Sequence, residues 1–198
     1  DFLLATSVSE RICGSLATAL MGAPGGQAML EQVEQRDLFL RRLDEEGLWF
    51  QYHHLFAEYL RQRLDRDEPG RIDQLHRTAS TWFAEHGMLS EAVDHALAAG
   101  DPARAVELVE RDGMELLEQG RMFTLLGLLA KLPPRQVSQS PRLQLTIAWA
   151  YNAAVRPVPA QAAVNLARAL LAAQQGDDAA LADLRAEADV VQADIHVI

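Results

Sequence analysis

The stretch Leu48-Trp49-Phe50-Gln51-Tyr52 has apolar side chains at its first, third and fifth positions, so these three share one face of an extended strand. A second apolar run, Leu38 to Leu43, precedes it, and the polar turn Asp44-Glu45-Glu46-Gly47 separates the two runs. Two short runs around a polar turn that ends in glycine predict a β-hairpin.

Helices are expected on both sides of this hairpin. From His54 onward the apolar residues recur at the spacing of one helix face. Upstream, helical spacing occurs in Phe2–Val8, Arg11–Met21 and Gln27–Arg36, with a glycine- and proline-rich break over 22–26. Helices, a hairpin and a closing helix are the plan of a winged helix domain, which we expect over residues 1–67.

The chain after residue 70 carries no strand signals. Helical hairpins are expected to start near residues 71, 102, 141 and 178, a spacing of roughly 31–39 residues that brackets the 34-residue tetratricopeptide period. The helix from Pro102 is expected to end at Gly113, because glycine commonly follows a helix C-terminus. The predicted fold class is therefore mainly α: a small winged helix domain with a β-hairpin, then a tetratricopeptide-like helical repeat over 68–198.

Composition and charge narrow the class of protein. The 198 residues carry 18 basic and 28 acidic side chains, a net charge of −10. No apolar run approaches the roughly 20 residues that a membrane span needs, and the chain opens without the basic region of a signal peptide. A single cysteine excludes an internal disulfide framework, so we expect a cytoplasmic protein that makes no contact with a membrane. The uncapped apolar end favours a fragment of a longer protein.

The sequence also lacks the residues for nucleotide hydrolysis. Its one lysine, Lys131, follows Ala130, whereas the P-loop signature needs a lysine directly after glycine. The Gly-x-Ser-x-Gly elbow of serine hydrolases is absent as well. We therefore expect no catalytic residue and no enzyme activity in this chain.

Direct DNA reading by the winged helix is not expected. Residues 1–67 contain seven arginines and eleven acidic residues, a net charge of −4. The acidic turn Asp44-Glu45-Glu46 would be the tip of the wing, where it would meet phosphates of like charge. This domain is therefore predicted to face a protein rather than a nucleic acid.

Two adjacent histidines, His53 and His54, stand where the second strand meets the next helix. Adjacent strand residues point to opposite faces, so we expect one imidazole inward and one outward. A simple role would be a hydrogen bond from one imidazole to a backbone group near the junction. A metal site would need further ligands at compatible spacing, and no His-Glu-x-x-His motif is present, so no metal is expected. Cys13 is expected to be a small core residue.

Aromatic residues occur at helical spacing in two places, Trp82-Phe83 and Trp149 with Tyr151. Side chains in such positions pack in a core more often than they line a ligand groove. Stacked helical hairpins form an extended concave surface, and that surface is where we expect a partner to bind.

Several stretches resemble the large ATP-dependent LuxR-type regulators that are similar to the maltose-regulon activator, a family called MalT-like below. The most specific are Trp49-Phe50-Gln51-Tyr52-His53-His54-Leu55-Phe56-Ala57-Glu58-Tyr59-Leu60 and Trp82-Phe83-Ala84-Glu85-His86-Gly87. Shorter matches lie within 6–14, 38–44 and 91–101. The resemblance covers about the first 135 residues. It implies the middle slice of a signal-transducing ATPase, with a P-loop core before the winged helix and a DNA-binding helix-turn-helix after the helical arm.

One site residue is implied by the same resemblance. Tyr52-His53-His54-Leu55-Phe56 is similar to a Met-His-Asp-Leu-Leu segment in related signalling ATPases, where the histidine contacts the β-phosphate of bound ADP. The matching residue here is His53, and His54 stands where the relatives carry an acid. The resemblance implies ATP or ADP and a weak regulatory ATPase in the full-length protein, and no cofactor in this chain alone.

The function expected from the sequence is that of a relay. Inducer binding on the helical arm would be passed to the chain's own nucleotide-binding core and C-terminal DNA-binding domain, and the open form would self-associate. The partner on the arm would be an inducer or a regulatory protein. The alternative is a helical-repeat adaptor for protein–protein interaction without a nucleotide link.

Overall fold

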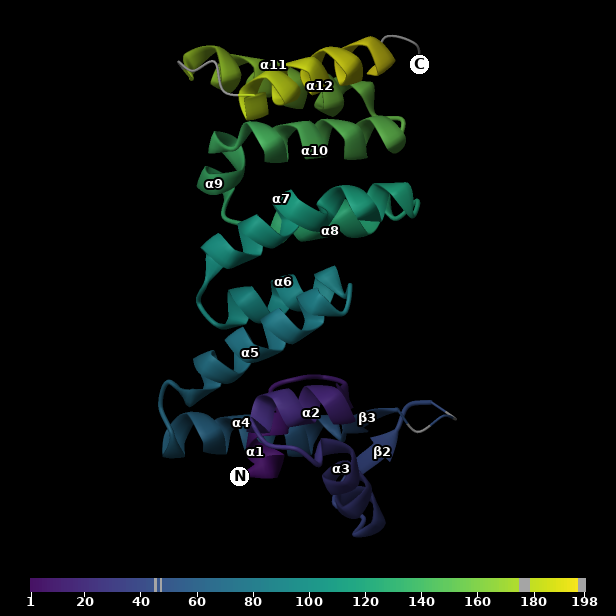
Figure 1. Cartoon of the computed structure of the whole chain (residues 1–198), viewed down its shortest axis with the longest axis vertical. Coiled ribbons are helices and arrows are strands. Elements are labelled where there is room, and N and C mark those ends of the chain that lie inside the picture. The colour runs from purple at the N-terminus through teal and green to yellow at the C-terminus, as the bar shows by residue number, and fades with distance from the viewer. Residues whose placement is uncertain (45, 47, 175–178, 196–198) are drawn as a thin grey trace. The chain divides into compact units, whose positions relative to one another are not determined.

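The structure is a computed structural model that describes residues 1–44, 46, 48–174 and 179–195. The chain divides into two compact units, Asp1–Asp101 and Pro102–Ile198, and each is described by itself. Figure 1 labels the helices of both units. The boundary expected after residue 67 falls inside the first unit, at the end of its fourth helix.

The first unit begins with a winged helix arrangement of four helices and three strands. Its elements are α1 (Phe2–Thr6), β1 (Ile12–Cys13), α2 (Gly14–Met21), α3 (Gly26–Gln35), β2 (Leu40–Arg42), β3 (Trp49–Tyr52) and α4 (His54–Asp67). The sheet is antiparallel in the order β1-β3-β2, so β3 is the central strand. The mainly helical fold with a small winged helix domain is confirmed.

The predicted hairpin is confirmed as β2 and β3, in which Arg42 pairs with Phe50 and Leu40 with Tyr52. Its turn is closed by Asp44, whose carboxylate accepts the backbone N–H of Leu48 at 2.9 Å. Two residues of the turn, Glu45 and Gly47, lie outside the described residues. Phe50 and Tyr52 are buried as their alternation predicts, whereas Leu48 is 52% exposed because it precedes the strand.

The helix expected over Arg11–Met21 is wrong at its start. Ile12 and Cys13 form strand β1, which pairs with Phe50 and Trp49 of β3, and the helix begins only at Gly14. Ile12 is fully buried in the same core as Phe50. Helical spacing could not reveal this, because a two-residue strand has no period of its own.

Two further helices complete the first unit. They are α5 (Arg71–Glu85) and α6 (Leu89–Ala98), and they pack against each other as a hairpin. Trp82 and Phe83 of α5 are buried, as the sequence predicts, and Trp82 meets Trp49 of β3 edge to face at 6.2 Å. Arg11 lies over the Trp49 ring at 4.7 Å and forms an ion pair with Glu91 of α6. The hairpin is therefore joined to the winged helix by aromatic and ionic contacts.

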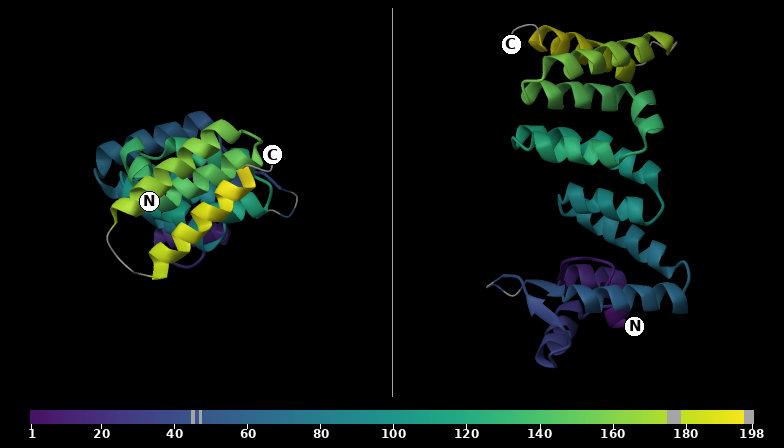
Figure 2. Two further views of the ribbon diagram at one scale, coloured as in Figure 1. Left: turned by 90° about the horizontal axis from the view of Figure 1, so that it is seen from above. Right: turned by 180° about the vertical axis from the view of Figure 1, so that it is seen from behind.

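The second unit is built from helices alone in its described part. They are α7 (Pro102–Glu118), α8 (Met122–Lys131), α9 (Pro134–Gln139), α10 (Pro141–Ala153), α11 (Pro157–Ala173) and α12 (Ala179–Ile195). Helices α10, α11 and α12 lie close together (Figure 2). Small side chains in their shared core, such as Ala160, Ala163 and Ala167, allow this close approach. Trp149 and Tyr151 are partly buried against this core, and Trp149 donates to Glu187 at 3.1 Å.

The helix expected to stop at Gly113 instead continues to Glu118. Gly113 is buried, and a Cβ atom at this position would lie 3.2 Å from Leu125 of α8. The glycine therefore serves close helix packing rather than helix termination. Among the described residues, no helix combines the length and the apolar character required to cross a membrane.

The backbones of α2 and α3 approach each other closely at Gly26. A Cβ atom on Gly26 would lie 2.3 Å from the carbonyl oxygen of Gly14 and 2.7 Å from the backbone nitrogen of Thr18. No side chain can yield here, because both neighbouring atoms belong to the backbone. Alanine at this position would force the two helices apart.

We predict that Gly26→Ala lowers the free energy of unfolding by about 1–3 kcal/mol, the usual cost of overpacking a tight contact. The matched control is Gly127→Ala in α8, where an added Cβ meets nothing within 4 Å. That variant should gain up to about 1 kcal/mol from helix propensity. Urea unfolding monitored by circular dichroism measures both, and equal stability of the two variants would contradict the packing argument.

A buried hydrogen bond ties the central strand to α1. The Thr6 hydroxyl donates to the carbonyl of Phe2 at 2.8 Å, so the Tyr52 hydroxyl donates to Thr6, also at 2.8 Å. Burial raises the pKa of Tyr52 to about 12. Because the folded state resists ionisation of this phenol, it loses stability as the pH rises from about 10 towards 12.

We predict that Tyr52→Phe costs about 1 kcal/mol at neutral pH and removes part of the alkaline destabilisation. Thermal unfolding at about pH 8 and about pH 11 should therefore show a smaller loss for the variant than for the wild type. Tyr59→Phe, at a position that is 55% exposed, is the control and should behave as the wild type. An unchanged alkaline loss in Tyr52→Phe would contradict the role of this phenol.

Candidate functional site

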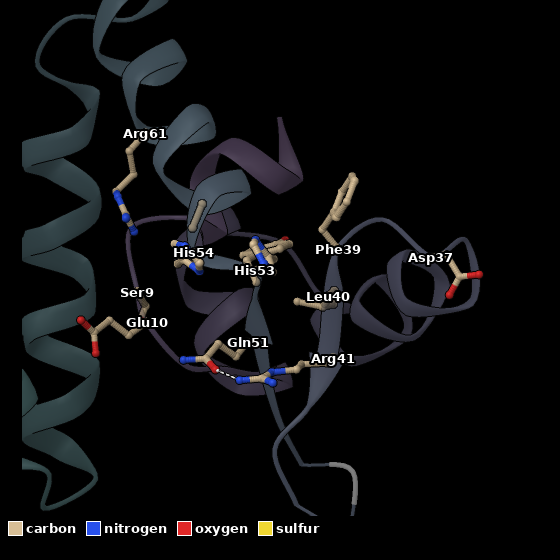
Figure 3. A pocket seen from close by; sticks show the side chains of 12 residues that line it. Ser9, Glu10, Asp37, Phe39, Leu40, Arg41, Gln51, His53, His54 and Arg61 are labelled. Atoms are coloured by element: carbon tan, nitrogen blue, oxygen red, sulfur yellow. Dashed lines mark hydrogen bonds between the residues drawn. The ribbon is translucent and has the colours of Figure 1, made fainter.

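A cavity of about 610 Å³ lies at the junction of β3 and α4 (Figure 3). Four parts of the winged helix form it: the loop before β1, the loop before β2, the hairpin strands and the first half of α4. Its polar lining residues are Ser9, Glu10, Asp37, Arg41, Gln51, Tyr52, His53, His54 and Arg61. Figure 3 shows His53 and His54 side by side between Arg61 and Phe39.

The backbone of His53 is fixed on both sides. Its N–H donates to the carbonyl of Phe39 at 2.7 Å, and its own carbonyl accepts the N–H of Phe56 at 2.9 Å and of Ala57 at 3.0 Å. His53 is thus the N-cap residue of α4, with an extended ψ of 133°. The chain turns from strand to helix at this residue, which leaves the imidazole at the surface.

The expectation that one of the two imidazoles points inward is wrong. Both His53 and His54 are exposed, and their rings lie 4.5 Å apart on the same cavity. Strand alternation ends at Tyr52, because His54 is already the first residue of α4. The geometry brings both histidines to one surface.

The rim of the cavity holds two residues with unusual backbone angles. Asp37 and Phe39 have φ values of 51° and 56°, in the left-handed region that residues other than glycine rarely occupy. Such a conformation costs on the order of 1 kcal/mol and commonly occurs near functional sites. It directs the Phe39 ring to a position 62% exposed, 5.2 Å from the ring of Phe56. No sequence signal marked these angles, because Leu38-Phe39-Leu40 is typical of a plain strand.

The two arginines and the two acidic residues that line the cavity carry equal and opposite charges. Arg41 donates to Gln51 at 3.0 Å, and Arg61 donates to the carbonyl of Ser7 at 3.0 Å, so both guanidinium groups are held at the wall. Glu10 and Asp37 bring two negative charges to the same lining. The imidazoles therefore decide whether the surface favours an anion. Each can donate an N–H to a phosphate or carboxylate oxygen.

His76, His86 and His95 do not line this cavity. His86 bonds to the carbonyl of Trp82 at 2.7 Å and stacks on its ring at 3.8 Å. His76 and His95 come within hydrogen-bond distance of each other, a pairing that sequence spacing did not reveal because it depends on how α5 folds back on α6. His196 lies outside the described residues. Across the part of the chain that the structure describes, no three His, Cys, Asp or Glu side chains are grouped to hold a metal ion.

Cys13 is a core residue, as predicted. Its side chain is 9% exposed, and its Sγ lies 3.3 Å from the hydroxyl of Ser15.

The cavity at the β3–α4 junction is therefore the candidate site, with His53 and His54 as its central groups.

The comparison with known proteins extends over nearly the whole chain. The serine/threonine-protein kinase PknK of Mycobacterium tuberculosis (strain H37Rv) is 53% identical over 193 residues, which cover 98% of this chain and 17% of that protein. PknK of Mycobacterium tuberculosis (strain CDC 1551 / Oshkosh) and of Mycobacterium bovis match to the same extent. The chain thus spans about a sixth of the length of the curated relatives it matches. Residues 1–72 match the MalT winged helix domain family. The first 72 residues are therefore similar to the MalT winged helix domain, and helical hairpins follow them.

Proposed function

We propose that this chain is the regulatory relay segment of a longer signalling protein. In this proposal the helical hairpins hold an inducer or a regulatory protein, and the winged helix passes the signal to a nucleotide-binding core elsewhere in the polypeptide. The observation that carries the proposal is the cavity at the β3–α4 junction, where His53 and His54 are exposed beside Arg41 and Arg61. The resemblance to signalling ATPases gives His53 the contact to a nucleotide phosphate.

The geometry suits a conditional phosphate contact. The His53 backbone is held by Phe39 and by the first turn of α4, so its imidazole is positioned without being enclosed. Glu10 and Asp37 offset the two arginines, which leaves this surface with little fixed positive charge of its own. A phosphate would be held firmly only when a second domain adds further donors, and would lose the histidine when the domains separate.

The output domain lies outside these residues in the proposal. The 53% identity to PknK favours a serine/threonine kinase as the output. The match to the MalT winged helix domain favours the second candidate, a LuxR-type regulator with a DNA-binding domain. In either case the present chain would act in the cytoplasm, would not contact nucleic acid itself, and would have no enzyme activity of its own.

An adaptor without a nucleotide link is the rival function. The exposure of Phe123 (73%) and Val158 (80%) in the second unit favours it, because a protein partner could cover these side chains. ADP binding by the full-length protein distinguishes the two functions.

We predict that His53→Ala in the full-length protein weakens ADP binding about tenfold, equivalent to about 1.4 kcal/mol for one lost hydrogen bond to a charged group. Basal output activity should rise, because the closed state would lose a contact. Isothermal titration calorimetry with ADP provides the measurement.

Two further variants sharpen this test. His54→Ala tells which of the adjacent imidazoles faces the phosphate, and His86→Ala, outside this cavity, is the matched control that should bind ADP as the wild type does. ADP retention by His53→Ala at the wild-type level would reject the assignment to His53. An absence of ADP binding by the wild type would favour the adaptor.

A further inference from the structure

A pair of histidines forms the contact between α5 and α6 in the first unit. Nδ1 of His76 in α5 lies 2.7 Å from Nδ1 of His95 in α6, and their ring centroids are 4.9 Å apart. Two nitrogen atoms at this distance can share only one proton between them, so one ring donates and the other accepts. This hydrogen bond exists while at least one of the two imidazoles is neutral. It is lost when both carry a proton on Nδ1.

Protein atoms cover the histidine pair on one side, and a cavity lies on the other. His95 is 7% exposed and stacks on Phe83, with the ring centroids 5.2 Å apart and the planes 19° from parallel. On the other side, both histidines line a cavity of about 350 Å³ between this hairpin and the loop before β1. His76 is only half-buried, so it is the ring with room to move.

The charged groups around the pair come from α4, α5, α6 and the loop before β1. Acidic residues outnumber basic ones, and one acid is already engaged by Arg11. The charged residues are Asp73 in α5, Glu91 and Asp94 in α6, Arg61 in α4, and Glu10 and Arg11 in the loop before β1. The helix α2, which also packs on α5, contains no ionisable side chain.

Burial opposes protonation at both positions. It lowers the pKa of His95 to about 4, with the neighbouring His76 acting in the same direction and Asp94 against it. Burial also lowers the pKa of His76, which Asp73 partly offsets. Since the unfolded chain takes up these protons near pH 6.5, the folded state binds fewer protons below that value. Its stability therefore falls as the pH drops from about 7 towards 4.

We propose that His76 and His95 form an acid-sensitive latch, which holds α5 against α6 while they share one proton and releases the hairpin when both rings are protonated. Two N–H groups at 2.7 Å repel each other, and His95 is only 7% exposed, so little water can solvate its charge. His76 then turns into the cavity towards the carboxylates. Because Arg11 links the same α6 to Trp49 of the sheet, release of the hairpin also weakens its attachment to the winged helix. This inference does not depend on the proposed nucleotide site.

The test compares the wild-type chain with the double variant His76→Gln/His95→Gln, whose amides can hydrogen-bond but do not titrate. Between about pH 7.5 and about pH 4 the wild type should lose about 5 °C in Tm, and the double variant less than half of that. Hydrogen exchange, corrected for its intrinsic pH dependence, should rise in α5 and α6 of the wild type by about fivefold relative to α10 and α11. His86→Gln, also at α5 but outside the pair, should behave as the wild type.

The wild type alone provides a second test, which holds even if the double variant does not fold. Imidazole ¹⁵N spectra across the same pH range should show one protonated and one unprotonated Nδ1 in the pair at neutral pH. The titration of these two rings should lie below the ordinary histidine value of about 6.5. Titration of both rings near pH 6.5, or an equal loss of Tm in wild type and double variant, would overturn the latch.

Discussion

The pairing of β3 with strands on both of its sides holds the first unit together. Phe50, fully buried, pairs with Ile12 on one side and Arg42 on the other. Tyr52, two residues later, reaches Thr6 of α1 through a buried hydrogen bond. One short strand thus joins the N-terminal helix, the hairpin and the core. The conformation of the residues that follow directly, including the two histidines, depends on where this strand ends.

The candidate site is a direct consequence of that ending. The chain leaves the sheet at His53, whose backbone N–H is still bonded to Phe39 while its carbonyl already begins α4. A residue in this position has a fixed main chain and an exposed side chain, which suits a contact that must form and break. The unusual backbone of Phe39 extends the same surface with an exposed aromatic ring. The site is therefore built from the sheet edge and the helix start together.

Small residues govern the packing elsewhere in the chain. Gly26 lets α3 approach the backbone of α2, and Gly113 lets α7 approach α8. In the second unit, alanines such as Ala163 and Ala167 have the same effect between neighbouring helices. Large aromatic side chains pack where a strand meets a helix, as Trp49 of β3 does against Trp82 of α5. Small residues thus allow helices to approach each other, whereas large aromatic residues fill the space between elements.

The sequence alone predicted the mainly helical class, the hairpin and the buried Trp82 and Cys13, because periodicity and turn residues are local properties. It could not reveal that Ile12 and Cys13 are a strand, that Gly113 lies within a helix, or that both junction histidines face one cavity. It gave no sign of the bond between His76 and His95 either. Each of these depends on which segments meet after the chain folds, and residues far apart in sequence leave no periodic signal of their contact.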